Sequence, residues 1–225
     1  MDAIGGDIWY VRGADFPLPG GARMPLGATV VRLPDRTLLV YAPIGFDAAS
    51  VAAINAAGVV AHVVAPNLLH HLFLKDALAN WPGATLYAPP GLAAKRPDLP
   101  PARPVSADDP AFGGVIDAVH LAGAPAVDET VLFHRPSATL LCGDLVFNLG
   151  APANLTSRIV FALMGVNGHL AQSRAWRFFR KDRDALRAAL DRVLAWPLAR
   201  LAPCHGEPAP VTARELSAVL QRAYR

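Results

Sequence analysis

The order of strand-like and helix-like segments constrains the fold of this chain more than any other feature. Alternating apolar residues and short apolar runs predict strands over residues 7–11, 28–33, 37–41, 59–65, 84–88, 115–121, 129–134, 138–141 and 198–202. Helical composition and spacing predict helices over residues 46–58, 68–81, 182–196 and 212–224. This order is β-rich, then αβ, then β-rich, then αβα, and it predicts two halves that each pair a sheet with outer helices.

Local signals mark some boundaries and leave others open. Asp47 is suited to cap the first helix and Gly58 to end it. Prolines are dense over residues 89–110 and no periodicity is visible there, which indicates an irregular surface segment within a domain. Residues 150–170 are mixed and stay unassigned. Because strands resume directly after residue 110, we expect a single domain over residues 1–225.

Composition excludes several classes of protein. Hydrophobic residues make up 53% of the chain and charged residues 17%, which is typical of a globular protein and excludes disorder. The formal net charge is +3, but acidic and basic residues mix over 174–192, so we expect no nucleic-acid partner. The apolar run 159–166 is too short to span a bilayer, so we expect no membrane partner.

The amino terminus and the cysteines indicate a cytoplasmic protein. The first residues include acidic side chains and no apolar run of the kind that a secretory signal requires. The two cysteines, Cys142 and Cys204, are too few for a disulfide framework and fit a reducing compartment. Their positions, close to Asp144 and His205, leave open a thiolate ligand or a redox pair.

Residues that commonly bind metals stand just beyond the ends of three predicted strands. His70 and His71 follow strand 59–65, Asp144 follows strand 138–141, and His205 follows strand 198–202. Sites in layered α/β folds gather at such strand ends. Imidazoles combined with a carboxylate suit Zn(II), and they also suit Fe(II) when coordination positions stay open. The sequence therefore predicts a site for one divalent metal, zinc or iron.

Four segments of the chain follow one another in a distinctive order: Thr29-Val30-Val31-Arg32-Leu33, Leu39-Val40-Tyr41-Ala42-Pro43, Pro66-Asn67-Leu68-Leu69-His70-His71 and Leu141-Cys142-Gly143-Asp144. Through them the chain resembles the metallo-β-lactamase superfamily along nearly its whole length. More narrowly, it is similar to a branch of unknown function in which Pro-Asn-x-x-His-His replaces the usual motif. The resemblance implies a four-layer αββα sandwich.

The departures from the superfamily pattern are also specific. Its motif His-x-His-x-Asp-His falls on residues 66–71, where Pro66 and Leu68 replace the first two histidines. The middle histidine of the family falls near Ala126, where no histidine stands, so one of the two usual metal positions is lost. The resemblance implies a remaining position formed by His71, by His70 in place of the motif aspartate, by Asp144 as the bridging aspartate and by His205.

A metal at this position implies hydrolysis of a small ester, thioester, amide or phosphoester, with Asp144 as the catalytic residue that orients water or acts as base. Residues 154–169 are then a candidate substrate lid. Two alternatives remain: a metal-free, inactive binding or scaffold protein of the same fold, and a non-haem iron redox protein if a cysteine approaches the site. The oligomeric state is not predicted.

Some neighbouring residues are expected to be structural. Adjacent helical residues point about 100° apart, so His70 and His71 need not both reach one ion. No spacing singles out Glu129 or the remaining histidines, which are His62, His120, His134 and His169. We also expect Trp176 and its aromatic neighbours to belong to the core.

Overall fold

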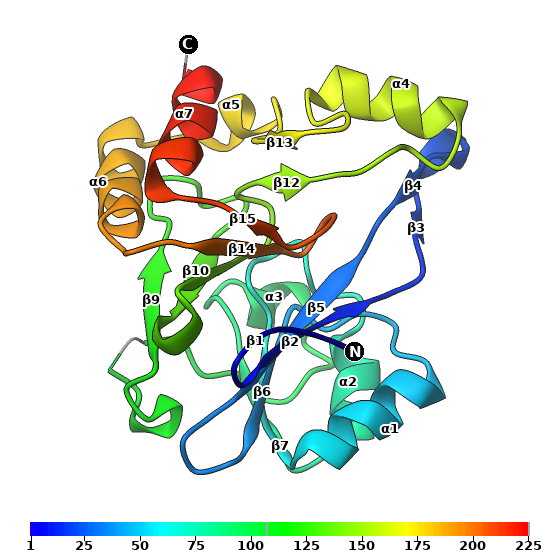
Figure 1. The fold of residues 1–225 in the computed structure, drawn as a ribbon, viewed down its shortest axis with the longest axis vertical. Coiled ribbons are helices and arrows are strands. Elements are labelled where there is room, and N and C mark those ends of the chain that lie inside the picture. The colour runs from blue at the N-terminus through cyan, green and yellow to red at the C-terminus, as the bar shows by residue number, and fades with distance from the viewer. Residues whose placement is uncertain (107, 225) are drawn as a thin grey trace.

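The computed structural model describes the chain except residues 107 and 225 and the side chains of residues 222–224. Two sheets dominate it (Figure 1). The first has the strand order β1(Asp2–Gly5), β2(Ile8–Arg12), β5(Gly27–Arg32), β6(Leu38–Tyr41), β7(Val60–Val64), β8(Thr85–Tyr87). The second has the order β15(Ala209–Pro210), β14(Arg200–Pro203), β11(Thr139–Cys142), β10(Thr130–His134), β9(Ile116–His120).

Parallel pairing is confined to the part of each sheet that carries the candidate ligands. In the first sheet β6, β7 and β8 are parallel, and the preceding strands form an antiparallel meander. In the second sheet β11 and β14 are parallel, and Cys142 pairs with Pro203. The carboxyl ends of β11 and β14 therefore lie side by side, which brings the residues after them to one edge of the sheet.

The helices cover the outer faces of the two sheets, so the predicted four-layer sandwich is confirmed. Val31, Leu39 and Tyr41 of the first sheet pack against Leu132 and Leu141 of the second. On the outer side of the first sheet lie α1(Ala48–Ala57) and α2(Leu74–Asn80), and on that of the second lie α5(Trp176–Phe179), α6(Arg183–Leu194) and α7(Ala213–Tyr224). Figure 1 shows α1 and α2 at the opposite end of the molecule from α6 and α7.

The predicted bounds are confirmed for α1, but the predicted start of α2 is wrong. Asp47 caps α1 by accepting a 2.7 Å hydrogen bond from the Ser50 amide, and Gly58 follows its last residue. The second helix begins only at Leu74, not near residue 68 as predicted. The side chain of Asn67 accepts hydrogen bonds from the amides of Leu69 and His70 and so holds this segment in a turn.

The stretches without a clear sequence period contain further short elements. Residues 150–170 include α4(Leu155–Met164), which is capped by Asn154 and followed by Gly165 in a left-handed conformation. The proline-rich stretch holds α3(Leu92–Lys95). Two small hairpins pair β3(Phe16–Pro17) with β4(Arg23–Met24) and β12(Phe147–Asn148) with β13(Leu170–Ala171).

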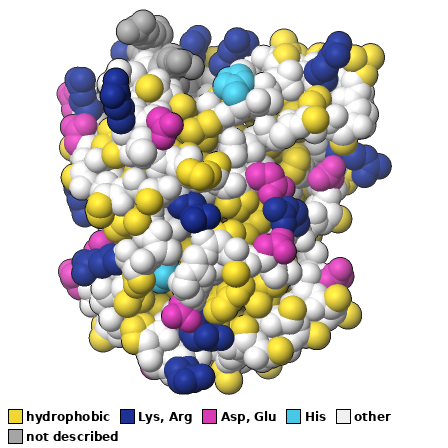
Figure 2. All heavy atoms as spheres, viewed as in Figure 1, with side chains coloured by type: hydrophobic (Ala, Val, Ile, Leu, Met, Phe, Trp, Pro, Cys, Tyr) yellow, Lys and Arg dark blue, Asp and Glu magenta, His cyan; other side chains and the backbone are white. Residues whose placement is uncertain are grey.

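The lengths of the described helices and the charges on one face of the molecule extend two observations from the sequence. Among the described residues, no helix is both long and apolar enough to cross a membrane. On the face in Figure 2, basic and acidic side chains are interspersed with hydrophobic ones, and no patch of a single charge gathers there. This pattern matches the mixed charges of the sequence.

Candidate metal centre

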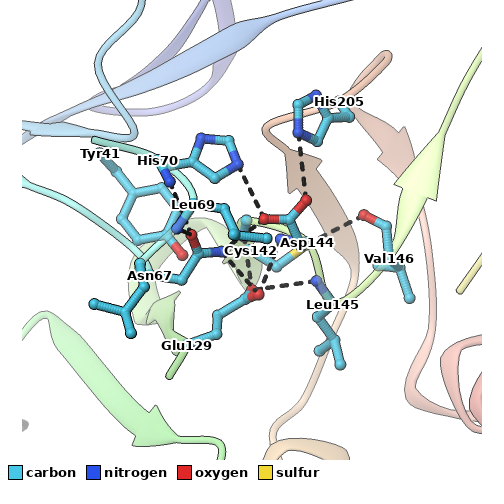
Figure 3. A network of polar contacts seen from close by, with 12 residues as sticks. Tyr41, Asn67, Leu69, His70, Glu129, Cys142, Asp144, Leu145, Val146 and His205 are labelled. Atoms are coloured by element: carbon cyan, nitrogen blue, oxygen red, sulfur yellow. Dashed lines mark hydrogen bonds and ion pairs between the residues drawn. The ribbon is translucent and has the colours of Figure 1, made fainter. Parts of the chain in front are cut away.

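Three side chains from the two sheets meet between the strand ends. His70 follows β7, Asp144 follows β11 and His205 follows β14. His70 Nε2 lies 3.3 Å from Asp144 Oδ2, and His205 Nε2 lies 3.5 Å from Asp144 Oδ1. One ligand atom from each residue lies within 4.8 Å of the other two. Figure 3 shows the two imidazoles approaching the Asp144 carboxylate from the same side.

Asn67 joins the loop of His70 to Asp144. Its Oδ1 accepts hydrogen bonds from the amides of Leu69 (2.8 Å) and His70 (3.0 Å). Its Nδ2 donates to Asp144 Oδ2 at 2.8 Å and to Glu129 Oε2 at 3.3 Å. The side-chain amide therefore has one consistent orientation, with oxygen toward the backbone amides and nitrogen toward the two carboxylates.

Glu129 shapes the loop that carries Asp144. Its Oε1 accepts from the amides of Gly143 (2.8 Å) and Leu145 (3.3 Å), and its Oε2 accepts from the Asp144 amide (2.9 Å). Burial and the charge of Asp144 raise the pKa of Glu129, while the donors around its oxygens act in the opposite direction. Every contact named here is with a donor, which is the arrangement that an ionised carboxylate needs.

The Asp144 carboxylate is held in its ionised form. Burial acts to raise its pKa, but the charge of His70 and the hydrogen bonds from both imidazoles lower the pKa of Asp144 well below its ordinary value. Its backbone is fixed as well, because Trp176 Nε1 donates a 2.7 Å hydrogen bond to the Asp144 carbonyl. Asp144 therefore offers a negatively charged, positioned carboxylate.

His205 is oriented by contacts on its other atoms. Its Nδ1 lies 3.0 Å from the Pro25 carbonyl, and its ring stacks on Phe147 with centroids 5.1 Å apart and planes at 7°. Because a carbonyl only accepts, we assign one proton to Nδ1; Nε2 then faces Asp144, to which it donates when the ring is protonated at both nitrogens. Burial acts to lower the pKa of His205, but the hydrogen bond and charge of Asp144 raise it above its ordinary value.

Close packing around the loops adds further constraints. A Cβ at Gly143 would lie 2.7 Å from Asn67 Nδ2, so a larger residue there would displace the amide from the carboxylates. The Tyr10 hydroxyl from the first sheet donates toward the carbonyls of Pro203 (3.0 Å) and Gly206 (2.6 Å), on either side of His205. The positions of both loops thus depend on residues distant in sequence.

The structure does not bring His71 into the predicted set of four ligands. Its Nδ1 lies 3.3 Å from Arg96 Nη1, and its carbonyl accepts a 2.6 Å hydrogen bond from the same nitrogen. Burial and the nearby cations Lys95 and Arg96 lower the pKa of His71. Within the described residues, the group that includes Asp144 contains His70 and His205 only. As adjacent residues, His70 and His71 point in different directions, and only His70 faces Asp144.

The cysteines lie close to the site without joining it. Cys142 and Cys204 are free and buried, and burial raises the pKa of both thiols well above the ordinary value. Neither sulfur belongs to the group of candidate ligands found among the described residues. Cys204 lines the same pocket as the candidate ligands without supplying one of the grouped ligand atoms, so the iron redox alternative stays a prediction that iron analysis of the purified protein tests.

A pocket of about 240 Å³ opens onto His70, Asp144 and His205. Met164, at the end of α4, is the one residue of the proposed lid helix that lines it. Asn67, Glu129 and Trp176 were not recognised from the sequence as residues that organise a site. Only Glu129 carried a usable signal there, namely a carboxylate at the start of an otherwise apolar strand.

Comparisons with known proteins identify the fold. No protein-family model matches the sequence, and none of the curated proteins matches it. A metallo-β-lactamase from Pontibacter korlensis aligns with 99% of this chain and 97% of its own at 15% identity and a TM-score of 0.66. FIM-1 from Pseudomonas aeruginosa, a metallo-β-lactamase in its mono-zinc form, covers 99% and 93% at 15% identity and a TM-score of 0.61.

A third similar structure is a flavodiiron core. The Flv1 flavodiiron core from Synechocystis sp. PCC6803 aligns with 98% of this chain at 16% identity and a TM-score of 0.65. The chain spans 59% of the length of that protein. At these identities the likenesses establish the architecture alone.

Proposed function

We propose that this chain, which has the metallo-β-lactamase fold, is a single domain that binds one divalent metal ion and hydrolyses a small molecule. The observation that carries the proposal is the convergence of His70, Asp144 and His205, whose ligand atoms lie within 4.8 Å of one another. Two imidazoles and a carboxylate form a ligand set that suits zinc or ferrous iron and leaves room for a substrate.

The surroundings of these three residues fit a metal site. Ligand histidines usually donate their other ring N–H to a carbonyl or carboxylate, and His205 is placed to do so at Pro25. Ligand carboxylates are usually hydrogen-bonded too, and Asp144 accepts from Asn67. With His71 turned toward Arg96, these residues provide for one ion and not for a dinuclear centre.

The residues of the chain have separate tasks in the proposed reaction. A bound divalent ion supplies Lewis-acid chemistry, which polarises an ester, thioester, amide or phosphoester and makes water a stronger acid. Asp144 and the two imidazoles would hold that ion. Because the pKa of Asp144 is held well below its ordinary value, its carboxylate is a weak base, so we assign it an orienting role in place of general base.

Metal analysis on purified protein tests the proposal. We expect about one zinc or iron per chain after reconstitution, and loss of that metal in His70→Ala, Asp144→Ala and His205→Ala. His71→Ala is the matched control, because His71 is the adjacent histidine that lies outside the group, and it should retain the metal.

The opposite result identifies the alternative function. A folded wild-type chain that binds neither zinc nor iron would be an inactive binding or scaffold protein, in which the contacts of His70 and His205 with Asp144 are purely structural. We further propose that the protein is cytoplasmic, in keeping with its free, buried cysteines. Fractionation of cells tests that assignment.

A further inference from the structure

The pocket above the candidate metal centre is polar at one end only. Among the described residues that line it, the polar side chains are His70, Asp144 and His205, apart from the thiol of Cys204. The rest of the lining is apolar, and it includes Phe16, Leu18, Met24, Leu26, Phe73 and Met164. None of the described lining residues is a lysine or an arginine.

The apolar wall is built from several separate elements. Phe16 of β3 packs edge to face against Phe73, with ring centroids 6.4 Å apart. Met24 of β4 is buried together with Phe147 of β12 in a small apolar cluster. Because hairpins and loops from both halves of the molecule contribute, the wall is an organised surface beside the site and not a gap under one loop.

The mouth of the pocket is apolar as well. Leu69 and Leu72 line the pocket, yet 42% and 52% of their surfaces are exposed to solvent. Leu69 lies in the turn that the Asn67 side chain fixes, and Leu72 lies between that turn and α2, both in the segment where the sequence predicted a helix. Exposed leucines at the rim of an apolar pocket are typical of a surface that a ligand covers.

We propose that this pocket binds an uncharged acyl compound whose carbonyl end lies toward Asp144 and whose short apolar chain lies against Phe16, Met24 and Phe73. The assignment of the carbonyl end rests on the proposed function. A charge on the part of the chain that lies against Phe16, Met24 and Phe73 is strongly disfavoured, because this apolar wall offers it no partner. The volume of about 240 Å³ is below the roughly 300–1,000 Å³ of sites for drug-sized ligands, so the chain is short.

Calorimetric titration with a homologous series of primary amides tests the inference. Propanamide, butanamide, pentanamide and hexanamide share one neutral head and differ only in chain length. Each added methylene should tighten binding about fourfold until the pocket is full, since burying a methylene contributes about 0.8 kcal/mol. Adipamic acid, a six-carbon amide with a carboxylate at its far end, should bind at least tenfold more weakly than hexanamide.

A substitution at the rim of the pocket should reverse the preference between hexanamide and adipamic acid. Leu72→Lys should weaken hexanamide binding and strengthen adipamic acid binding, because it places a cation at the apolar end. Val59→Lys is the matched control: Val59 is 74% exposed and does not line the pocket, so this variant should behave as the wild type does. Both substitutions are at exposed positions, where a lysine does not disturb the core.

The two proposals fail in different ways. The titrations are run on chelator-treated and on metal-reconstituted protein. Dependence on chain length without metal binding would overturn the metal site and uphold the apolar pocket. Metal binding with equal affinity for all the amides, or with a preference for adipamic acid in the wild type, would overturn the pocket assignment and uphold the metal site.

Discussion

Asn67 donates a hydrogen bond of 2.8 Å to the carboxylate of Asp144, a residue that follows a strand of the other sheet. The same amide nitrogen lies 3.3 Å from Glu129, and the amide oxygen fixes the turn of His70. One neutral side chain thus separates two buried carboxylates and positions a candidate ligand. Both the neutrality and the orientation of the Asn67 side chain can be tested by substitution.

Replacement of Asn67 separates these two roles. Asn67→Ala removes the hydrogen bonds and should lower the free energy of unfolding by about 1–3 kcal/mol. Asn67→Asp keeps the shape and the acceptor oxygen but brings a third carboxylate against Glu129 and Asp144, so it should cost more, about 2–5 kcal/mol. Denaturant unfolding measures both, and an Asn67→Asp variant as stable as Asn67→Ala would contradict the ionised state of Asp144.

Trp176→Phe should weaken metal binding although Trp176 lies behind Asp144. The substitution removes the 2.7 Å hydrogen bond to the Asp144 carbonyl, and loss of such supporting contacts typically lowers metal affinity about 10–100-fold. Trp81→Phe is the matched control, because it removes an indole hydrogen bond of 2.9 Å to Asn55 on the other outer face. Both variants should lose about 1–3 kcal/mol of stability, and equal metal affinity in the two would overturn the role of Trp176.

The two thiols should be inert in the folded protein. Burial raises the pKa of Cys142 and Cys204, and the thiolate is the reactive form, so DTNB should modify neither cysteine rapidly under native conditions. Both should react once the chain is unfolded in denaturant. The variant Val59→Cys supplies an exposed thiol as the positive control. Rapid native labelling of either natural cysteine would show that the interior is open around it.

His134 should make the protein less stable in mild acid. Burial lowers its pKa from the ordinary 6.5, so the unfolded chain binds more protons between the folded pKa and about 6.5. Stability falls as the pH drops through this window and is unaffected by His134 above it. The slope from this residue is at most about 1.4 kcal/mol per pH unit.

The variant His134→Gln isolates this contribution. It should show a smaller loss of unfolding free energy between pH 7 and pH 5 than the wild type. Parallel curves for the wild type and His134→Gln would rule out His134 as the source.

Much of the fold could be predicted from local patterns in the sequence. Asp47 and Gly58 set the ends of α1 because capping depends on neighbours a few residues away. The strand ends placed His70, Asp144 and His205 together, since the strands of each sheet have few arrangements open to them. The sequence did not predict α4 although Asn154 and Gly165 are ordinary cap residues. Its apolar residues are divided between a buried side, with Phe161, and an exposed side, with Leu155, Ile159 and Leu163.

The rest of the site depends on contacts between distant residues. Glu129 accepts hydrogen bonds from the amides of residues 143–145. Its place at the start of an apolar strand marks it as unusual, but nothing near residue 129 in the sequence identifies these partners. The direction of His71 is decided by Arg96, which follows α3 in a stretch without periodicity. The motif alone could not separate His70 from His71, because the two are adjacent and chemically identical.

The residues of the candidate metal site come from both halves of the molecule. His70 and Asn67 follow a strand of the first sheet, whereas Asp144 and His205 follow strands of the second. Neither half contains the complete constellation, so it exists only after the two sheets have packed together. Metal affinity is therefore a direct measure of native assembly, and a chain that folds one half correctly and misdocks the other would be recognised by its failure to retain an ion.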